Sequence, residues 1–551
     1  MKPSEDIISL TGGFGFYQKT RFLILCISMS ILCPFVLFGL IMMTYTPRHW
    51  CKVPDELAHF STNLSELIPL VQRFERWELH SCEMFDYRID ENGILILGNS
   101  TITCPQGWEF DLTEFGTTLV SEFSLVCQNG FHKTLILTIA IASNLVGCLL
   151  FAYVSDRMGR KPTLLLCTVL HFLCFTTTAF IPSWIAFCVL WSLGAVSTIA
   201  MFQIAYVHSL EICGTRHRAP VTVVMNVLYN LSLVVLAAIG YLTRTWQSFV
   251  LCVNVPSLGL ALLLLLLDES PRYLLSHGKH DSALTVLTKI ARINGLSMTK
   301  QQLRASLESA IEMTAPTKAK QTAVKHYGPW EVFRQKHLCL KFVILTSLSF
   351  GCLSLYQGLQ YNVQNMQGNP YLTFAVLALS AMPGNLFVWL ASERLGRIWP
   401  LGGGSILAGI VSILASLTVE GSVWLSLGLA FLSRTAILVV WNFYYLTSGE
   451  YFPTVLRANG IALIRTVAGV LICTIPLVSE SAQTTNSRSM PLLIFGSITL
   501  VAGSICFFLP ETAKTPLLDT IQESELKQKV GLRALKNNLT CKHVRRIQTI
   551  H

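Results

Sequence analysis

The chain has 551 residues, of which 52% are hydrophobic and only 13% are charged, and its formal net charge is +10. A soluble protein of this size carries about twice that charged fraction, so the composition excludes an ordinary globular protein. The positive charge is spread unevenly over segments between apolar runs, which argues against a nucleic-acid partner.

Apolar runs of about 20 residues recur along the whole chain, and each is long enough to cross a bilayer. Backbone polar groups inside lipid must be satisfied within the segment, so we predict helices. We expect no cleavable leader, because a polar segment with Lys19 and Arg21 precedes the first run. The twelve predicted spans are 21–44, 134–154, 162–181, 183–207, 220–241, 248–267, 339–360, 371–391, 399–419, 421–446, 458–478 and 490–509.

The charges between these runs predict the orientation of the chain in the membrane. Residues 46–132 carry five Lys/Arg against thirteen Asp/Glu, whereas 268–338 carry eleven against six and 510–551 carry eight against four. Basic segments stay in the cytoplasm. Both termini and the 268–338 segment are therefore expected inside, and the acidic 46–132 loop outside.

The outer loop contains four of the seventeen cysteines, namely Cys51, Cys82, Cys104 and Cys127. An even number of cysteines in an oxidising compartment predicts two disulfides, with three pairings open. Asn63 and Asn99 begin glycan acceptor sequences in the same loop. We expect no metal and no cofactor, because no metal-ligand spacing or nucleotide-binding glycine loop is present.

Three charge patterns occur twice, at offsets of 237, 239 and 242 residues. They are Asp156-Arg157-Met-Gly-Arg160 with Glu393-Arg394-Leu-Gly-Arg397, Glu211 and Arg218 with Glu450 and Arg457, and Glu269 with Glu511. The nearly constant offset predicts two homologous six-helix halves. We expect an N-terminal half at 1–267, a basic cytoplasmic linker at 268–338, a C-terminal half at 339–509 and a cytoplasmic tail at 510–551.

All of these charges, together with Arg272, fall at helix ends predicted to face the cytoplasm. Acids and arginines there would pair when the inner side is closed and separate when it opens, as a reversible gate between rocking halves. Each such pair at a water interface is worth about 1 kcal/mol, so a set of pairs holds one state without freezing it. The alternative is that the charges only anchor helix ends and orient loops.

The repeated Asp-Arg-x-Gly-Arg pattern resembles the major facilitator superfamily. Within it, the chain resembles the organic cation, organic anion and carnitine transporter family (solute carrier family 22) through GGFGFYQ at 12–18, CPQGWEFD at 104–111, ESPRYLLSHGK at 269–279 and LPET at 509–512. This resemblance covers nearly the whole chain. It implies an all-α polytopic membrane protein, with twelve transmembrane helices in two pseudo-symmetric six-helix bundles and its site between the halves.

The resemblance also points to substrate-binding positions, of which two depart from the family. The family usually has an acid at one position of the eighth helix, and at one of the eleventh it often has an acid in cation carriers or an arginine in anion and carnitine carriers. The corresponding residues here are Ala381 and Gly469. Arg465 lies one turn before Gly469 on the same helix face. Its guanidinium would hold a carboxylate or sulfate with two hydrogen bonds. The alternative is that Arg465 snorkels or bonds to the backbone.

Further candidates come from the same resemblance. Tyr356 would offer an aromatic face for a cation or for stacking. Asn226 and Asn442 stand where relatives carry Gln, and Phe202 falls on a family aromatic. Helix packing is the alternative for each aromatic.

Other ionisable residues of the spans are interpreted differently. Arg434 is expected to have a structural role near a helix end, and His208 to join the cytoplasmic charge cluster. His171 is interpreted as a packing residue. Trp191 replaces an arginine that the family carries in the fourth helix, which predicts fewer gate charges in the N-terminal half.

These observations favour a secondary-active or facilitative transporter of small organic ions in the plasma membrane over an enzyme, since no catalytic grouping is present. An arginine without a carboxylate repels cations in a low dielectric, so anions or zwitterions are favoured as substrates. A counter-transported solute or coupling ion remains open, as do two alternatives: an organic cation or carnitine-like transporter, and a non-transporting receptor or scaffold.

Overall fold

The computed structural model describes residues 11–512 except 55–56, 58–63, 74–75, 91–94, 114, 215–216, 297, 299, 315–330, 367, 392–394, 449, 453–455 and 485–486. Within the described residues, eleven helical segments are long and apolar enough to cross a membrane, and the shorter apolar helix α22 (Met490–Cys506) follows them. The predicted twelve-helix arrangement is confirmed, with its last helix just 17 residues long.

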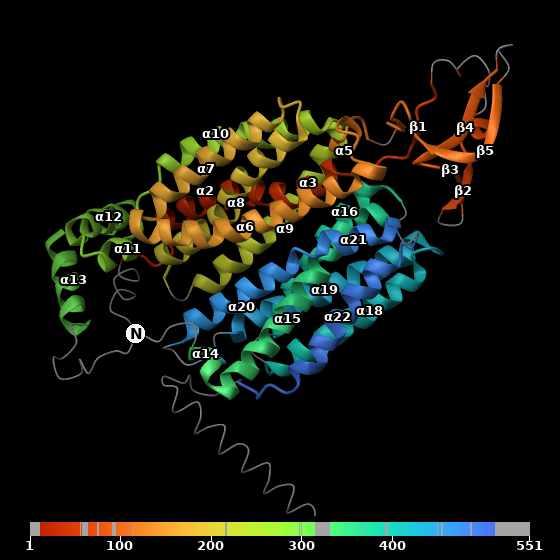
Figure 1. The fold of residues 1–551 in the computed structure, drawn as a ribbon. Coiled ribbons are helices and arrows are strands. Elements are labelled where there is room, and N and C mark those ends of the chain that lie inside the picture. The colour runs from red at the N-terminus through yellow and green to blue at the C-terminus, as the bar shows by residue number, and fades with distance from the viewer. Residues whose placement is uncertain are drawn as a thin grey trace, which may run out of the picture.

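The first half contains six spans, several with a local change in helix type. They are α2 (Phe16–Pro34) continued by η1 (Phe35–Gly39) and α3 (Leu40–Met43), α6 (Gly130–Met158), α7 (Arg160–Thr178), α8 (Trp184–Ile212), α9 (Arg218–Thr243) and α10 (Trp246–Leu265). Figure 1 shows these helices together as one bundle.

The second half repeats this arrangement in its own bundle (Figure 1). Its helices are α15 (Lys336–Tyr361), α16 (Pro370–Leu379) with α17 (Ala381–Ala391), η6 (Trp399–Gly403) with α18 (Gly404–Thr418), α19 (Val423–Ser448), α20 (Arg457–Ile472) with α21 (Ile475–Thr484), and α22. The packing is repeated too. Helices α6 and α7 pack on α8 as α17 and α18 pack on α19, and α7 packs on α10 as α18 packs on α22.

Two glycines that the sequence motifs did not single out mark equivalent helix crossings. A Cβ atom at Gly147 of α6 would overlap the Val196 carbonyl oxygen of α8. A Cβ atom at Gly384 of α17 would lie 3.2 Å from the Thr435 carbonyl oxygen of α19. Gly384 follows Gly147 at the same offset of 237 residues as the first charge motif. The internal repeat therefore extends from the loops into the helix contacts.

The eleventh span differs from its predicted boundaries. It was expected at 458–478, but the membrane-length segment runs from Gly460 to Ala482, with a break between α20 and α21. The predicted span ended too early because polar residues around Glu480 end the apolar run in the sequence. An acidic residue consequently lies on a membrane-spanning helix, where the sequence analysis placed none.

The 46–132 segment forms a small structure that is held together by two disulfides. It contains α4 (Leu64–Leu67), α5 (Leu119–Glu122) and η2 (Cys127–Asn129), besides strands β1 (His49–Cys51), β2 (Leu70–Arg73), β3 (Arg76–Leu79), β4 (Glu83–Ile89), β5 (Leu95–Thr103) and β6 (Trp108–Phe110). The strands pair antiparallel as β1–β6, β2–β3 and β4–β5. Disulfides join Cys51 to Cys104 and Cys82 to Cys127, and Asn99 is exposed on β5.

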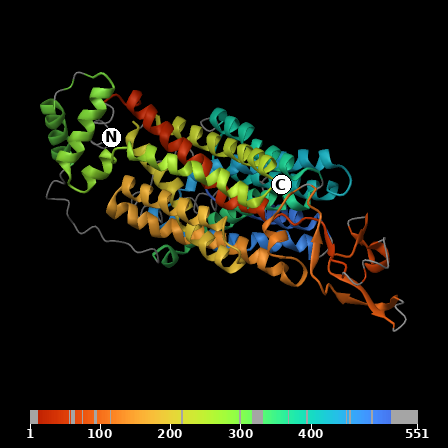
Figure 2. The same cartoon turned by 90° about the horizontal axis from the view of Figure 1, so that it is seen from above.

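The linker supplies α11 (Pro271–Ser276), α12 (His280–Ile293), α13 (Lys300–Thr314) and α14 (Glu331–Arg334). In both views, α11–α13 lie at the end of the bundles opposite the strands (Figures 1 and 2). We call the end with the strands the loop end and the end with α11–α13 the linker end.

Polar contacts join the linker to the first half. The Asn294 side chain accepts a hydrogen bond from the Tyr17 backbone N–H and donates to the Thr11 carbonyl oxygen. Asp268 accepts from the Tyr17 hydroxyl at 2.8 Å and pairs with Lys289 at 2.7 Å. Partial burial raises the pKa of the Asp268 carboxyl, but the hydrogen bonds from Lys289 and Tyr17 outweigh it and hold that pKa below its ordinary value.

Candidate substrate site and gates

In the part of the chain that the structure describes, the interior of the spanning helices contains arginine and no carboxylate. Arg434 and Arg465 lie well inside α19 and α20, whereas the acids of the spanning helices, Asp156, Glu211 and Glu480, lie near helix ends. An ionised side chain at membrane depth is costly and marks a functional position unless a partner neutralises it. The surroundings of the two arginines therefore decide what this site can bind.

Arg434 is fully buried in the middle of α19, so its expected place near a helix end is wrong. Its guanidinium carbon lies 4.4 Å from the ring centroid of Tyr356. Its Nη1 donates to Gln360 Oε1, while Nε and Nη2 have no hydrogen-bond partner among the described residues. Tyr356 and Gln360 are one turn apart on α15, so a single face of that helix receives the cation.

Ala381 occupies the position in the eighth helix where the resemblance implies an acid. The Thr435 hydroxyl donates to the Ser380 carbonyl oxygen at 3.1 Å, which fixes the start of α17 beside the turn of α19 that carries Arg434. Ala381 itself is fully buried. The resemblance led us to expect an acid here in cation carriers, and a methyl group occupies the position instead.

Arg465 is half-buried and has a similar aromatic partner. Its guanidinium carbon lies 4.7 Å from the ring centroid of Tyr445, which is 46% exposed. One turn further along α20, a Cβ atom on Gly469 would lie 2.8 Å from Leu145 of α6. Gly469 thus lets α20 approach the other half closely, and Arg465 lies beside that contact.

The remaining candidates make contacts with other residues. Asn442 donates to Asn385 Oδ1 at 3.2 Å, which joins α19 to α17. Phe202 packs edge-on against Tyr229 at 5.5 Å between ring centroids. Asn226 is half-buried on α9, one turn before Asn230. Phe38 of the first half meets Tyr356 of the second edge-on at 6.5 Å, so Tyr356 lies where the halves meet.

At the loop end an ion pair crosses between the halves. Lys133 of α6 lies 3.1 Å from Glu480 of α21 and donates to the Thr46 hydroxyl at 2.8 Å. Lys133 is 3% exposed and Glu480 is 26% exposed. Close by, the Gln364 amide donates to the Ile41 carbonyl oxygen at 2.8 Å, another bond between the halves. The sequence analysis missed Lys133 and Glu480 because the first precedes its predicted span and the second follows its own.

A stack of aromatic rings also closes the loop end. The ring of Phe115, near the end of the 46–132 segment, stacks on the ring of Tyr45 at 4.1 Å and on that of Tyr371 at 4.7 Å between ring centroids. Tyr241 packs edge-on against Tyr371 at 5.7 Å. Tyr371 lies in the first turn of α16 in the second half, whereas Tyr45 and Tyr241 belong to the first half. The outer loop therefore supplies one ring of a stack that spans both halves.

At the linker end, the charges of the first half bind one another. Arg160 lies 3.1 Å from Glu211 and 2.8 Å from Asp156. Glu269 accepts hydrogen bonds from the backbone N–H groups of Arg160 and Lys161, at the N-terminus of α7. A carboxylate is favoured there by the helix dipole and the free N–H groups.

The second half repeats this cluster almost group for group. Arg397 lies 3.4 Å from Glu450, and Glu511 accepts from the backbone N–H groups of Arg397 and Ile398 at 2.8 and 3.2 Å. The Thr512 hydroxyl donates to Glu450 at 2.6 Å. In both halves each of these bonds stays within one bundle, so rocking of rigid bundles leaves it intact.

Several predicted gate residues take other positions. Arg157 lies over Tyr153 at 4.5 Å, Arg272 is half-buried on α11, and Trp191 is buried against Phe175 and Phe187. Trp191 precedes Glu211 by twenty residues, about 30 Å along a helix, so it cannot thin the charge cluster as expected. Glu393, Arg394, Asn63 and the side chains of Arg218 and Arg457 lie outside the described residues.

The two histidines are both buried. His171 lies 3.1 Å from the Thr198 hydroxyl and packs edge-on against Phe175, a packing environment. His208 lies one turn before Glu211 on α8, and its Nδ1 has no hydrogen-bond partner among the described residues. Neither ring lies beside Arg434 or Arg465 in any contact that the described residues show.

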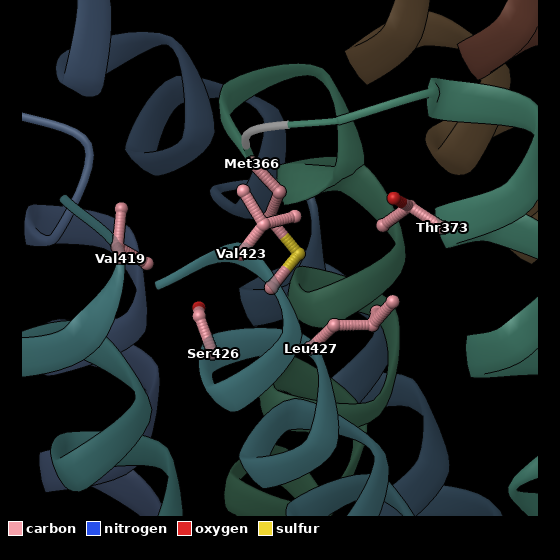
Figure 3. A pocket seen from close by; sticks show the side chains of 6 residues that line it. All are labelled: Met366, Thr373, Val419, Val423, Ser426 and Leu427. Carbon is pink, nitrogen blue, oxygen red and sulfur yellow. The ribbon is translucent and has the colours of Figure 1, made fainter. Parts of the chain in front are cut away.

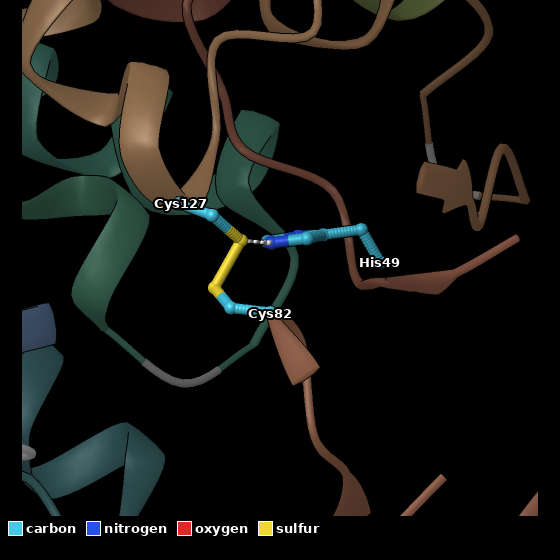
Figure 4. Close-up of side chains that lie close together, drawn as sticks. All are labelled: His49, Cys82 and Cys127. Carbon is cyan, nitrogen blue, oxygen red and sulfur yellow. Dashed lines mark hydrogen bonds between the residues drawn. A yellow bond between two sulfur atoms is a disulfide. The ribbon is translucent and has the colours of Figure 1, made fainter. Parts of the chain in front are cut away.

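Two other groupings lack the features of an organic-ion site. Figure 3 shows a pocket of about 10 Å³ lined by Met366, Thr373, Val419, Val423, Ser426 and Leu427, room for about one water molecule. Figure 4 shows His49 beside Cys82 and Cys127. The two sulfurs are bonded to each other, so they are not thiolate ligands for a metal.

Comparisons with known proteins agree with this architecture. Residues 116–523 match the sugar (and other) transporter family. The chain is 26% identical to the beta-alanine transporter of Drosophila melanogaster, covering 95% of this chain and 89% of that one. It is 27% identical to organic cation transporter 1 of Caenorhabditis elegans (95% and 88%) and to solute carrier family 22 member 1 of Oryctolagus cuniculus (95% and 96%).

Among solved structures, the inward open conformation of the E. coli xylose transporter XylE matches with a TM-score of 0.57. The match covers 75% of this chain and 92% of that one at 16% identity. Such low identity supports the major facilitator fold alone.

Proposed function

This chain belongs to the sugar (and other) transporter family, and from that premise we propose that it carries small organic ions across the plasma membrane by alternating access, with anions or zwitterions favoured over cations. The proteins it is similar to are transporters rather than enzymes. The finer proposal, the charge of the substrate, depends on the interior of the helices.

The observation that carries this proposal is the buried, incompletely paired guanidinium of Arg434. A buried charge without a counter-ion costs several kcal/mol, which a substrate carboxylate would offset through two parallel hydrogen bonds. A cationic substrate would meet like charge in a low dielectric. Arg465, half-buried over Tyr445, would provide a second positive group for the same solute.

The name of one relative fits this charge pattern. β-Alanine, for which the Drosophila relative is named, carries both a carboxylate and an ammonium group. For a zwitterion of this kind we propose that Arg434 or Arg465 binds the carboxylate. The other candidate aromatic and amide groups, Tyr445, Asn442, Asn226 and Phe202, would receive the remainder of the solute.

We further propose that the outer loop faces the cell exterior and both termini the cytoplasm, as the charge distribution indicates. Asn63 and Asn99 would then be glycosylated. The bilayer contacts the whole outer surface of the helices. A solute gradient, exchange or the membrane potential would drive transport.

Uptake by expressing cells tests the proposal. Labelled benzoate, β-alanine and tetraethylammonium are compared in the wild type and in Arg465→Gln, with surface protein measured in parallel. We expect uptake of benzoate or β-alanine that falls at least severalfold in the variant. Uptake of tetraethylammonium alone would contradict the proposal, and uptake of none by protein at the surface would favour a receptor or scaffold.

An organic cation is the second candidate substrate. Two observations favour it: the organic cation transporter of Caenorhabditis elegans is among the relatives, and aromatic rings lie near the site. The same uptake experiment separates the two candidates, because a cation carrier would keep its tetraethylammonium uptake in Arg465→Gln.

A further inference from the structure

The ion pair at the loop end has its positive and its negative group on opposite halves. Nζ of Lys133 on α6 lies 3.1 Å from Oε2 of Glu480 on α21, and it also donates to the Thr46 hydroxyl. An ion pair whose members belong to two separate bodies is divided when those bodies move apart. Each time the loop end opens, the ammonium of Lys133 and the carboxylate of Glu480 therefore lose each other as partners.

Polar groups next to Glu480 have hydrogen-bonding capacity that the closed state does not use. The short helix η5 (Asn362–Asn365) is tied to α21, because the Asn365 side chain donates to the Ser479 carbonyl oxygen at 3.0 Å and to Asn362 Oδ1 at 2.8 Å. The Ser479 hydroxyl and Asn362 Nδ2 are buried and have no hydrogen-bond partner among the described residues. Buried polar groups are nearly always paired in proteins, so these two groups are available to a polar ligand.

The two opposite charges discriminate between classes of solute. A singly positive solute is attracted by Glu480 and repelled by Lys133, and a singly negative solute meets the reverse combination. A zwitterion that places its carboxylate at Lys133 and its ammonium at Glu480 gains both attractions and meets neither repulsion. Complementary charge patterns of this kind determine specificity more than they determine the strength of binding.

We propose that Lys133 and Glu480 form a loop-end binding site for small zwitterions. As the halves part, the carboxylate of the solute replaces Glu480 as the partner of Lys133, and its ammonium replaces Lys133 as the partner of Glu480. The bound solute then joins α6 to α21, as the ion pair does in the closed state. This inference rests on the proposed function and narrows its substrate class from anions or zwitterions to zwitterions.

Three solutes of matched size test the charge rule in the wild type. β-Alanine carries both charges, propionate lacks the ammonium, and propylammonium lacks the carboxylate. Equilibrium dialysis of the purified protein with labelled β-alanine measures how strongly each unlabelled solute competes. We expect propionate and propylammonium to compete at least about tenfold more weakly than β-alanine, which corresponds to about 1.4 kcal/mol. Competition by either of them as strong as that by β-alanine would overturn the inference without the need for any variant.

Neutral variants assign each part of this preference to one side chain. Glu480→Gln should remove most of the advantage of β-alanine over propionate, because the ammonium has lost its partner and propionate is no longer repelled. Lys133→Gln should remove most of the advantage of β-alanine over propylammonium. Glu480→Asp keeps the charge and should keep both advantages. A pair that only holds the halves together would change the affinity for all three solutes by the same factor, and unchanged ratios in the neutral variants would contradict the inference.

Two further variants serve as controls. In Lys133→Glu combined with Glu480→Lys, a zwitterion binds in the reverse orientation and should keep its advantage over both singly charged solutes. Arg465→Gln removes a cation from the interior of α20 instead, and should weaken the binding of β-alanine and propionate by the same factor. Loss of both advantages in the charge-reversed variant would contradict the inference, as would a change of the β-alanine to propionate ratio in Arg465→Gln as large as that in Glu480→Gln.

The two proposals fail differently. Absence of benzoate and β-alanine uptake by wild-type protein at the cell surface contradicts the proposed function. The binding ratios need no transport, and equal competition by the three solutes contradicts only the loop-end site. Binding of none of the three solutes also contradicts that site, even where benzoate uptake supports the proposed function.

Discussion

The two ends of the molecule are held together in different ways. At the loop end, side chains from one half contact the other: Lys133 pairs with Glu480, and the Phe115 stack joins Tyr45 to Tyr371. At the linker end, Arg160 and Arg397 each find their acid within their own half. Contacts between the halves exist in one conformational state, because they break when the halves move apart. Contacts within a half make that half a rigid body. The structure is therefore closed at the loop end, and its repeated charge clusters connect helices within each bundle.

The largest effect is expected from removing the acid of the crossing ion pair. Glu480→Gln leaves the ammonium of Lys133 almost wholly buried without its counter-ion, which costs about 2–4 kcal/mol of the loop-end closed state. Opening at that end should become far more frequent. Met42 of α3 lies with Phe115 and Tyr371 in the lining of a small pocket at the loop end. The rate at which a membrane-impermeant maleimide labels a cysteine placed at Met42 measures this opening.

The charge-reversed pair is the control for this prediction. Glu480→Lys alone places two cations together and should open the loop end further, whereas Lys133→Glu combined with Glu480→Lys should restore slow labelling. If the single and double variants label equally fast, the ion pair does not hold the closed state.

The second prediction concerns the ring contributed by the outer loop. Phe115→Ala removes both stacking contacts and most of a buried aromatic surface, which should weaken closure by about 1–3 kcal/mol. Labelling at Met42 should accelerate, and Phe115→Tyr, which keeps the ring, should behave nearly as the wild type. An unaffected rate in Phe115→Ala would show that the loop only covers the gate.

The third prediction compares the equivalent acids at the linker end. Glu269→Gln weakens two charge-assisted bonds at a half-buried helix N-terminus and should cost about 1–2 kcal/mol of stability. Glu511→Gln weakens the equivalent bonds at an exposed position and should cost less than about 1 kcal/mol. Thermal unfolding in detergent measures both. Neither should alter labelling at Met42, and a change there would mean that the clusters bridge the halves.

The smallest effect is pH-dependent and concerns Asp268. Because its folded-state pKa is depressed, ionised Asp268 contributes stability above its unfolded pKa of about 3.9, and this contribution is lost as the pH falls through the folded value. Asp268→Asn should be less stable than the wild type by under about 1 kcal/mol at pH 7, and equally stable near pH 2. A gap in unfolding temperature that persists at acidic pH would contradict the assignment.

The fold was largely predictable because its signals are local or periodic. Apolar runs predict helices whatever their neighbours, and the offset of the charge motifs predicts two halves. The same offset relates Gly147 to Gly384, so the repeat could also have located the helix crossings. Cys51 and Cys104 come together where β1 pairs with β6. The spacing of the cysteines in the sequence does not predict this strand pairing.

The site was less predictable, since its contacts join helices that are distant in the sequence. Arg434 was visible within an apolar run, but nothing local shows that it meets Tyr356 and Gln360 on α15. Glu480 was missed for another reason. A hydropathy window ends at polar residues, whereas the helix continues as long as a partner such as Lys133 neutralises the acid.

The position of Phe115 has a consequence for pharmacology. The outer loop folds around two disulfides, and one of its own rings lies within the gate. An antibody fragment that recognises the folded loop would hold Phe115 in place without approaching the substrate path. Such a fragment is expected to lower the maximal transport rate at every substrate concentration, which makes the loop a target for inhibitors that substrate cannot displace.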